Sequence, residues 1–194
     1  MEILFSDKDI AVCIKPIGVD SEKQLPELLA EALGGDFYTV HRLDKNVGGV
    51  MVYARSSRSA AELSSAIQNG KMIKEYFALV HGTPEPCGVM EDLLFKDSAK
   101  NKVFVVKRER RGVKKAKLEY DVVRAGETSL VHIRLHTGRS HQIRVQFASR
   151  GYPLLGDRKY GARDEYTAPM LFSSRITFPH KDNVLTFEAK PDWA

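Results

Sequence analysis

The feature that most constrains the fold is an alternation of apolar and polar residues, which recurs in short segments along the whole chain. Successive side chains of a β-strand point to opposite faces of a sheet, so a period of two is typical of half-buried strands. The predicted strands lie at residues 3–5, 10–14, 50–53, 72–80, 102–107, 118–123, 131–135, 170–178 and 185–188. Because strands outnumber helical segments, the sequence predicts a fold built on a sheet.

Helical periodicity is confined to three short segments. Their ends are marked by glycines and by an early Pro26, and we expect Ser57 and Ser140 to be N-caps. The predicted helices lie at residues 25–33, 59–68 and 140–150. The 194 residues contain no repeat and no low-complexity linker. We therefore predict a single α+β domain over residues 1–194, with a mixed, mostly antiparallel sheet.

The composition is that of a globular protein, with 43% hydrophobic and 28% charged residues. No apolar run approaches the ~20 residues that span a bilayer. The N-terminus places the acidic Glu2 and Asp7 among apolar residues, unlike a signal peptide. We therefore expect a cytoplasmic protein with no membrane association.

The sequence offers little to bind a metal. Cys13 and Cys87 are far apart and form no CxxC pair, so a disulfide framework or a thiolate site is not expected. Six histidines occur, but the local pairs His41 with Asp44 and His136 with His141 fall on turn-like segments that do not enforce a shared face. The chain also lacks the glycine-rich phosphate loop, the dinucleotide fingerprint and the hydrolase GxSxG motif. We expect no metal site.

Positive charge is concentrated in one segment. Residues 100–117, KNKVFVVKRERRGVKKAK, hold nine basic residues and one acidic residue, whereas the whole chain carries a net charge of only +5. Such a cluster is the electrostatic footprint of a surface that follows a polyanion such as nucleic acid. A solvated hairpin is the alternative interpretation of the same pattern.

The segment YTVHRLDKNVGGVMVYA contains the first candidate for chemistry. We expect a strand to bring in His41, Arg42 and Leu43, with Asp44 at its end before a glycine-containing turn. Glycines there let the backbone turn tightly and let a large ligand approach closely. An aspartate at a strand end can also be ordinary turn chemistry.

A second dense set of polar groups lies in LHTGRSHQIRVQFASRGYPLLGDRKYG. A turn at Gly138 is expected to lead into a helix that carries Arg139, His141, Gln142 and Arg144. Cationic groups and unpaired backbone N–H groups at a helix N-terminus favour an anion, which can be an RNA phosphate or an aspartate. The alternative is a helix with a solvated basic face and a core-facing apolar side.

Together these segments resemble the successive motifs of the RluA-type pseudouridine synthase family. The matching blocks are KPIG at 15–18, HRLD at 41–44, KEYFALVHG at 74–82, and TGRSHQIR at 137–144 with GDRKYG at 156–161. They occur in family order and span nearly the whole chain. The resemblance implies isomerisation of uridine in RNA without cofactor or metal, on an α+β pseudouridine synthase fold whose mixed sheet is split by a central catalytic cleft.

The resemblance also implies a role for particular residues. Asp44 corresponds to the catalytic aspartate, Tyr76 to the active-site tyrosine and Arg144 to the arginine that pairs with the aspartate. Arg42 resembles the family arginine that enters the RNA helix where the target base leaves it. His41 and His141 are expected to be hydrogen-bonded scaffold residues rather than an acid or a base.

The chemistry calls for these residue types on independent grounds. The N1–C1′ bond must break, the uracil must rotate, and C5 must bond to C1′ while water is excluded. An ionised carboxylate such as Asp44 can stabilise the oxocarbenium-like sugar, attack it or remove a neighbouring proton. A guanidinium such as that of Arg144 keeps a desolvated carboxylate charged and oriented. The ring of Tyr76 offers a face for uracil, and its hydroxyl can help move the C5 proton.

A uridine in folded RNA must first be everted, which costs a few kcal/mol for unstacking. Basic residues can offset this cost by holding phosphates in a salt-dependent way. The predicted RNA-binding residues are Arg42, Arg139, Lys107, Arg108, Arg110, Arg111, Lys114, Lys115 and Lys117. We expect a monomer whose partner is RNA, either ribosomal or transfer RNA.

The chain departs from the family pattern after HRLD. The family usually continues with two variable residues and Thr-Ser-Gly, whereas this chain has Val47, Gly48 and Gly49 at the last three positions. The loss of both hydroxyls has three possible consequences: a looser turn, recognition of another RNA, or impaired catalysis. From the length we also expect no extra N-terminal S4 RNA-binding domain, which many members of the family carry. The alternatives to an active synthase are a non-catalytic RNA-binding protein of the same fold and a metal-dependent nuclease or hydrolase.

Overall fold

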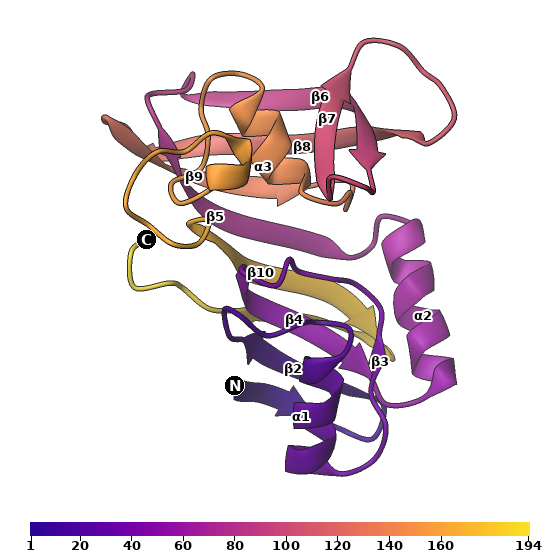
Figure 1. Ribbon diagram of the computed structural model, residues 1–194. Coiled ribbons are helices and arrows are strands. Elements are labelled where there is room, and N and C mark those ends of the chain that lie inside the picture. Colours follow the sequence, from indigo (N-terminus) through magenta and orange to yellow (C-terminus); the bar gives the residue numbers. More distant parts are fainter. The chain divides into compact units, whose positions relative to one another are not determined.

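The computed structural model describes residues 1–194, which form two compact units (Figure 1). Unit 1 comprises Met1–Lys74 together with Phe172–Ala194, and unit 2 comprises Glu75–Leu171. Each unit contains strands and at least one helix. Unit 1 is therefore made from both ends of the sequence, and unit 2 is made from the continuous segment between them. No helix is long and apolar enough to cross a bilayer.

Unit 1 is built on strands in the order β1–β2–β4–β10, with β3 added to β4 and β11 added to β10. The pairing of β4 with β10 is parallel and the other pairings are antiparallel. The strands are β1 (Glu2–Ser6), β2 (Ile10–Lys15), β3 (Tyr38–Thr39), β4 (Gly48–Ala54), β10 (Leu171–His180) and β11 (Asn183–Glu188). Helices α1 (Gln24–Leu33) and α2 (Ser57–Gln68) complete it.

The core of unit 1 joins residues from both ends of the sequence. Ile10 and Val52 from the N-terminal part pack with Ile176 and Phe178 of β10, and all four side chains are fully buried. Leu63 of α2 joins the same cluster through its apolar face. Burial of a large aliphatic or aromatic side chain stabilises a fold by about 1.5–3 kcal/mol, so β10 contributes substantially to this core.

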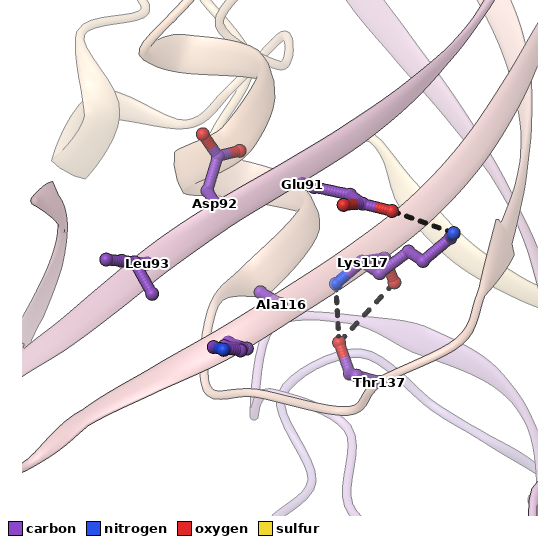
Figure 2. Close-up of a pocket in the computed structure, with 7 residues that line it drawn as sticks. Glu91, Asp92, Leu93, Ala116, Lys117 and Thr137 are labelled. Atoms are coloured by element: carbon purple, nitrogen blue, oxygen red, sulfur yellow. Dashed lines mark hydrogen bonds and ion pairs between the residues drawn. The ribbon is translucent and has the colours of Figure 1, made fainter. Parts of the chain in front are cut away.

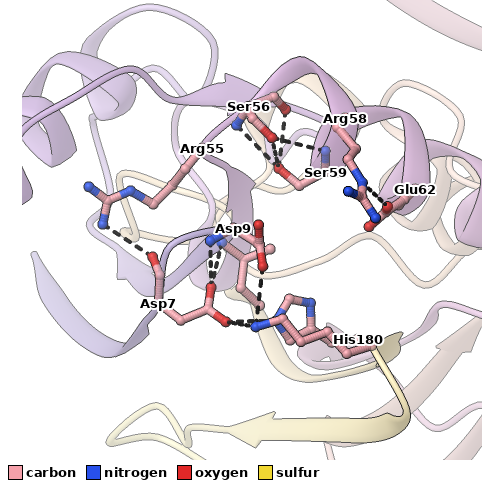
Figure 3. Close-up of polar contacts among 10 residues, drawn as sticks. Asp7, Asp9, Arg55, Ser56, Arg58, Ser59, Glu62 and His180 are labelled. Carbon is pink, nitrogen blue, oxygen red and sulfur yellow. Dashed lines mark hydrogen bonds and ion pairs between the residues drawn. The ribbon is translucent and has the colours of Figure 1, made fainter.

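Polar contacts tie the β1–β2 turn to the β10–β11 turn in the same unit (Figure 3). His180 and Lys181 both bond to the Asp7 carboxylate, at 2.9 and 2.8 Å, and Lys181 also reaches Asp9 at 3.2 Å. Burial alone would raise the pKa of Asp7, but these hydrogen bonds and two backbone N–H groups hold the pKa well below its usual value. Asp7, Asp9 and His180 lie close enough together to ligate a cation, but the Lys181 ammonium is bonded to both carboxylates. This cluster is therefore an anchor within unit 1.

Unit 2 contains the strand order β5–β9–β8–β6–β7. The pairings of β6 with β7, β6 with β8 and β8 with β9 are antiparallel. The strands are β5 (Ile73–His81), β6 (Cys87–Asp97), β7 (Lys102–Val106), β8 (Val113–Arg124) and β9 (Thr128–Leu135). Helix α3 (Gln142–Ala148) packs on β6 and β7, and the short 3-10 turn η1 (Arg158–Tyr160) contacts α3. The α+β class and the mixed, mostly antiparallel pairing are as predicted.

Several local predictions were wrong. β6 was missed because its buried positions are interrupted by charged residues, and β8 begins five residues before the predicted start. The predicted strand through His41–Leu43 does not form, because β3 ends at Thr39 and an irregular segment follows. Helix α3 starts only at Gln142, so Arg139 and His141 precede it rather than lie on it.

The predicted N-caps were also wrong. Ser56, not Ser57, caps α2, and its side chain accepts from the Ser59 backbone N–H at 3.1 Å. Ser59 returns the contact to the Ser56 backbone N–H at 3.2 Å, which completes a reciprocal capping box (Figure 3). At α3 the cap position is His141 rather than Ser140, and it has a left-handed φ of 49°.

Candidate active site

Asp44 lies in unit 1 on a tight turn between β3 and β4. The Val47 N–H donates to the Asp44 carbonyl at 2.9 Å and closes the turn. The carbonyls of both residues next to Asp44 are also held: the Ser21 hydroxyl donates to the Leu43 carbonyl at 3.0 Å, and Gly18 N–H donates to the Lys45 carbonyl at 2.9 Å. The backbone that carries the predicted catalytic aspartate is therefore fixed by residues far away in the sequence.

Lys15 is the buried cation of this turn. Its side chain is only 1% exposed, and its ammonium donates to the carbonyls of Pro16, Val19 and Lys45 at 2.9, 2.7 and 3.1 Å. Burial lowers the pKa of Lys15 to about 8, although the negative charges of Asp20 and Asp44 oppose this shift. At neutral pH the ammonium is therefore mostly charged and lies within electrostatic reach of Asp44.

The departure from the family pattern falls on buried positions. Val47 is 2% exposed, so an apolar side chain takes the place of a hydroxyl. A Cβ at Gly48 would meet the Lys15 carbonyl oxygen at 3.2 Å. Gly49 has a φ of +123°, and a Cβ there would lie 2.3 Å from the Ser173 carbonyl oxygen. Gly49 is thus required by the close parallel pairing of β4 with β10.

Arg42, predicted to bind RNA, lies at the surface of unit 1. Its guanidinium forms an ion pair with Glu22 at 2.7 Å, and both side chains are about half exposed. An exposed pair of this kind contributes about 0–1 kcal/mol. The Arg42 guanidinium can therefore leave Glu22 for a stronger acceptor with little loss of free energy.

His41 is a hydrogen-bonded scaffold residue, as expected. Its Nε2 accepts the Val52 backbone N–H at 3.2 Å, which ties the irregular segment to β4. Burial, and then the positive charge of Lys74, lower the pKa of His41 to about 3. The ring is therefore neutral at physiological pH and is not suited to act as a general acid or base.

Tyr76 and Arg144 both belong to unit 2. Tyr76 lies on β5 and is 5% exposed, and Arg144 lies on α3 and is 8% exposed. Arg144 makes a two-pronged pair with Asp157, from Nε to Oδ2 at 2.7 Å and from Nη2 to Oδ1 at 2.8 Å. A guanidinium is planar and its N–H donors have a fixed geometry, so this pair fixes the orientation of the Arg144 side chain.

Tyr160 extends the arrangement around Arg144. The guanidinium carbon lies 5.2 Å from the centre of the Tyr160 ring, and the Tyr160 hydroxyl oxygen lies 2.8 Å from Nδ1 of His141. The same oxygen accepts the Val103 backbone N–H at 2.9 Å. His141 is thus a scaffold residue, as predicted, and Arg144 is held by Asp157 on its edge and an aromatic ring on its face.

Arg139 is positioned by the turn that precedes α3. Gln142 accepts hydrogen bonds from the Thr137 hydroxyl and the Arg139 backbone N–H, at 2.8 and 3.0 Å. The exposed Arg139 side chain donates to the Lys115 carbonyl at 2.9 Å. This contact connects the predicted RNA-binding arginine to β8 of the basic segment.

The basic segment forms β7, the first part of β8 and the loop that joins them. Lys107, Arg108, Arg110 and Arg111 lie in the loop, and Lys114, Lys115 and Lys117 lie on β8. All are exposed except Lys117, which is partly buried. Two of the lysines are paired with acids, Lys115 with Glu109 at 3.1 Å and Lys117 with Glu91 at 2.8 Å.

Comparison with known sequences assigns the family. Residues 7–149 match the family described as RNA pseudouridylate synthase. The Escherichia coli dual-specificity RNA pseudouridine synthase RluA is 33% identical over 209 residues, which cover 98% of this chain and 93% of that protein. The chain belongs to the RluA-type pseudouridine synthase family. The resemblance of its sequence motifs to this family is confirmed.

Other relatives are longer than this RluA-type chain. An uncharacterized RNA pseudouridine synthase of Aquifex aeolicus is 35% identical over 192 residues, and the match covers 89% of this chain but 60% of that protein. Among solved structures, human RNA pseudouridylate synthase domain containing 1 has a TM-score of 0.86 at 21% identity, covering all of this chain and 84% of that one. Domain containing 4 has a TM-score of 0.83 at 24% identity, with 99% and 89% covered. These two structures share the fold.

Sequence reasoning missed four residues that support the predicted site. Lys15 and Asp157 lie within the quoted motifs KPIG and GDRKYG but were given no role, and Ser21 and Glu22 lie outside any motif. A lysine at the end of the apolar strand IAVCIK was the available signal for a buried cation. The contact between Asp157 and Arg144 spans 13 residues and carries no periodic signal.

Proposed function

We propose that this RluA-type chain isomerises uridine to pseudouridine in structured RNA, either ribosomal or transfer RNA, with Asp44 as its catalytic carboxylate. The observation that carries the proposal is the membership of the family together with the aspartate, tyrosine and arginine at the matching positions. The braced backbone at Leu43 and Lys45 supports it, because a reacting group gains from a fixed position.

In the proposed reaction the N1–C1′ bond breaks and its electron pair leaves with N1 of the uracil. The uracil then rotates, C5 bonds to C1′, the C5 proton is lost and N1 gains a proton, so the product is an isomer of the substrate. Asp44 stabilises or attacks C1′, attacks the ring, or removes a sugar proton; the chemistry of a carboxylate allows each route.

The other two residues support the charge and the base. We propose that Arg144 is the counter-ion of Asp44, since it stands at the matching position of the family motif and its pair with Asp157 fixes the direction of the guanidinium. Tyr76 supplies a flat ring against uracil and a hydroxyl that relays the C5 proton. Arg42 and Arg139 contact the RNA, and Arg42 exchanges its Glu22 partner for the space left by the everted base.

Replacement of Asp44 tests the proposal. In Asp44→Asn the side chain keeps its shape and loses its charge, so we expect pseudouridine formation to fall by more than about a thousandfold and RNA affinity to stay within about twofold. The measurement is pseudouridine content by mass spectrometry of RNA transcripts, with filter binding of the same RNA. Asp36→Asn, an identical change at an exposed position, is the control and should retain full activity.

A specific observation favours a second candidate function. Val47 and Gly48 replace the two hydroxyls that the family usually has after its catalytic aspartate, which fits a non-catalytic RNA-binding protein of the same fold. The second candidate predicts RNA binding by the wild type with no pseudouridine formed. Mapping pseudouridines in total cellular RNA with and without the gene separates the two, and a missing site identifies the target uridine.

A further inference from the structure

The sheet formed by β6, β7 and β8 in unit 2 has two different faces. Residues paired across antiparallel strands share a face, and Glu91 pairs with Lys117, Leu93 with Lys115 and Phe95 with Val113. The next strand adds Phe104 opposite Phe95 and Val106 opposite Leu93. We call this set the outer face, and it comprises Glu91, Leu93, Phe95, Phe104, Val106, Val113, Lys115 and Lys117.

The opposite face forms part of the core. Leu94, Val103 and Ala116 are buried there against Val145 of α3. Lys114 pairs with Leu94 and therefore belongs to this side. The basic segment is thus divided, because Lys115 and Lys117 project from the outer face and Lys114 projects from the other.

The outer face keeps an apolar surface in contact with solvent. Phe104 is 37% exposed, and Leu93, Phe95, Val106 and Val113 are only partly buried. Two hollows of about 430 Å³ each adjoin on this face and share Leu93 and Lys115 in their walls. Figure 2 shows the first hollow, with Glu91 and Lys117 joined across the strands and Thr137 at its edge.

The lysines of the outer face are held by exchangeable partners. The Lys117–Glu91 and Lys115–Glu109 pairs are exposed to solvent, with 43% and 81% of the lysine side chains accessible. Hydrogen bonding between Lys117 and Glu91 raises the pKa of the lysine and lowers that of the acid, so both are charged at neutral pH. Solvent-exposed pairs hold weakly, so a phosphate can displace either glutamate.

Aromatic rings with cationic neighbours lie beside these lysines. The Arg110 guanidinium carbon is 4.5 Å from the centre of the Phe95 ring, and the Lys102 ammonium is 5.8 Å from the centre of the Phe104 ring. Aromatic rings and guanidinium planes are the groups on which unpaired bases of RNA stack. A protein partner is less favoured than RNA, because the core of a protein–protein interface is apolar and depleted of charged residues.

We propose that the outer face binds an unpaired segment of RNA, with phosphates at Lys115 and Lys117 and bases stacked on Phe104 and on Arg110 above Phe95. The inference deepens the proposed function, because it assigns a second RNA-binding site to the same chain. The positive charges of Lys115 and Lys117 suit phosphates, and the two adjoining hollows beside aromatic rings suit bases. We therefore infer that the occupant is a single strand of RNA.

The test measures binding of a short fluorescent cytidine oligonucleotide, which has no uridine to modify. In Lys117→Gln we expect severalfold weaker binding, and the slope of log affinity against log salt should fall by about 0.7, the value for one phosphate contact on a single strand. Lys96→Gln makes the same charge change at an exposed lysine that pairs with Val103 on the other face, and it should leave affinity within about twofold. Phe104→Ala should weaken binding about five- to a hundredfold through lost stacking.

Replacement of a glutamate should tighten binding, whereas misfolding would weaken it, so a tighter variant cannot be explained by misfolding. In Glu91→Gln the Lys117 ammonium loses its partner, so binding should tighten about two- to fivefold. Glu31→Gln, an exposed position on α1 in unit 1, has the same net charge and should bind as the wild type. Equal tightening in both variants would overturn the inference, because it would reflect net charge alone.

The remaining outcomes are equally decisive. Equal weakening by Lys117→Gln and Lys96→Gln, or normal binding by Phe104→Ala, would overturn the inference even if the wild type forms pseudouridine. Conversely, face-specific binding by a wild type that forms no pseudouridine would sustain it while the proposed catalytic function fails. Circular dichroism confirms that each variant is folded before its affinity is compared.

Discussion

Lys15 illustrates how a single buried residue fixes the turn around Asp44. Three backbone carbonyls accept hydrogen bonds from its ammonium, and one of them belongs to Lys45, the residue after the aspartate. The motif KPIG could be seen in the sequence, but its function could not. The lysine and the turn are 30 residues apart, and only the folded chain places the ammonium under the carbonyls.

The lowered pKa of Lys15 predicts a specific dependence of stability on pH. Below pH 8 the lysine is charged in both states, and burial of this charge costs folding free energy. Between pH 8 and 10.5 the folded state binds fewer protons than the unfolded state, so stability rises with pH. We expect the free energy of unfolding of the wild type, relative to Lys15→Met, to increase by up to about 3 kcal/mol across this range. Urea unfolding at several pH values measures it, and parallel pH curves would contradict it.

At the scale of elements, strand positions followed from the alternation of side chains, whereas strand ends and helix caps did not. Ser56 and Ser57 are both good capping residues in sequence, and the structure selects Ser56 because its extended backbone directs the hydroxyl at the Ser59 N–H. β6 was hidden because one of its faces is the exposed outer face, where Glu91 and Leu93 weaken the alternation.

The cap of α2 can be tested by two neighbouring substitutions. Ser56→Ala removes the hydroxyl that accepts the Ser59 N–H, so we expect a loss of about 1 kcal/mol in the free energy of unfolding. Ser57→Ala changes an exposed residue of the first turn and should stay within about 0.5 kcal/mol of the wild type. Chemical denaturation of both variants makes the comparison, and the reverse order would restore the original prediction of Ser57 as the cap.

Alanine substitutions at Gly49 and Gly70 distinguish the cost of backbone strain from the cost of steric conflict. Both have positive φ, but an added Cβ meets nothing within 4 Å at Gly70 and lies 2.3 Å from a backbone oxygen at Gly49. We expect Gly70→Ala to cost about 1–2 kcal/mol and Gly49→Ala to cost more than about 4 kcal/mol, if the variant folds at all. Thermal unfolding of purified variants decides this, and similar costs would mean that β4 and β10 can separate locally.

At the scale of the whole molecule, the order of the chain makes unit 1 depend on its last 23 residues, Phe172–Ala194. Ile176 and Phe178 are fully buried in the core formed with β2 and β4. Unit 2 is continuous in sequence and has its own buried cluster around Leu94 and Val145. The prediction of one α+β domain did not anticipate this discontinuous arrangement, since periodicity reports local structure only.

Truncation tests this dependence. A chain that ends at Leu171 exposes the apolar faces of β2 and β4, so we expect unit 1 to lose its protection from hydrogen exchange. A synthetic peptide of residues 172–194 should restore that protection. A chain that lacks only Pro191–Ala194, beyond β11, should be protected like the wild type. Persistent protection of β2 and β4 in the first truncation would show that the core does not need β10.

The sequence by itself determined the strand-rich α+β class, the family and the identity of Asp44, Tyr76 and Arg144 as candidate residues, because alternation and short motifs are local properties of a chain. Only the tertiary structure decided which groups hold them. Three features depend on contacts between distant segments: the pair of Arg144 with Asp157, the hydrogen bond from Lys15 to the Lys45 carbonyl, and the division of the basic segment between two faces. Periodicity shows which face of an element is buried, but it does not show which distant residue that face will contact.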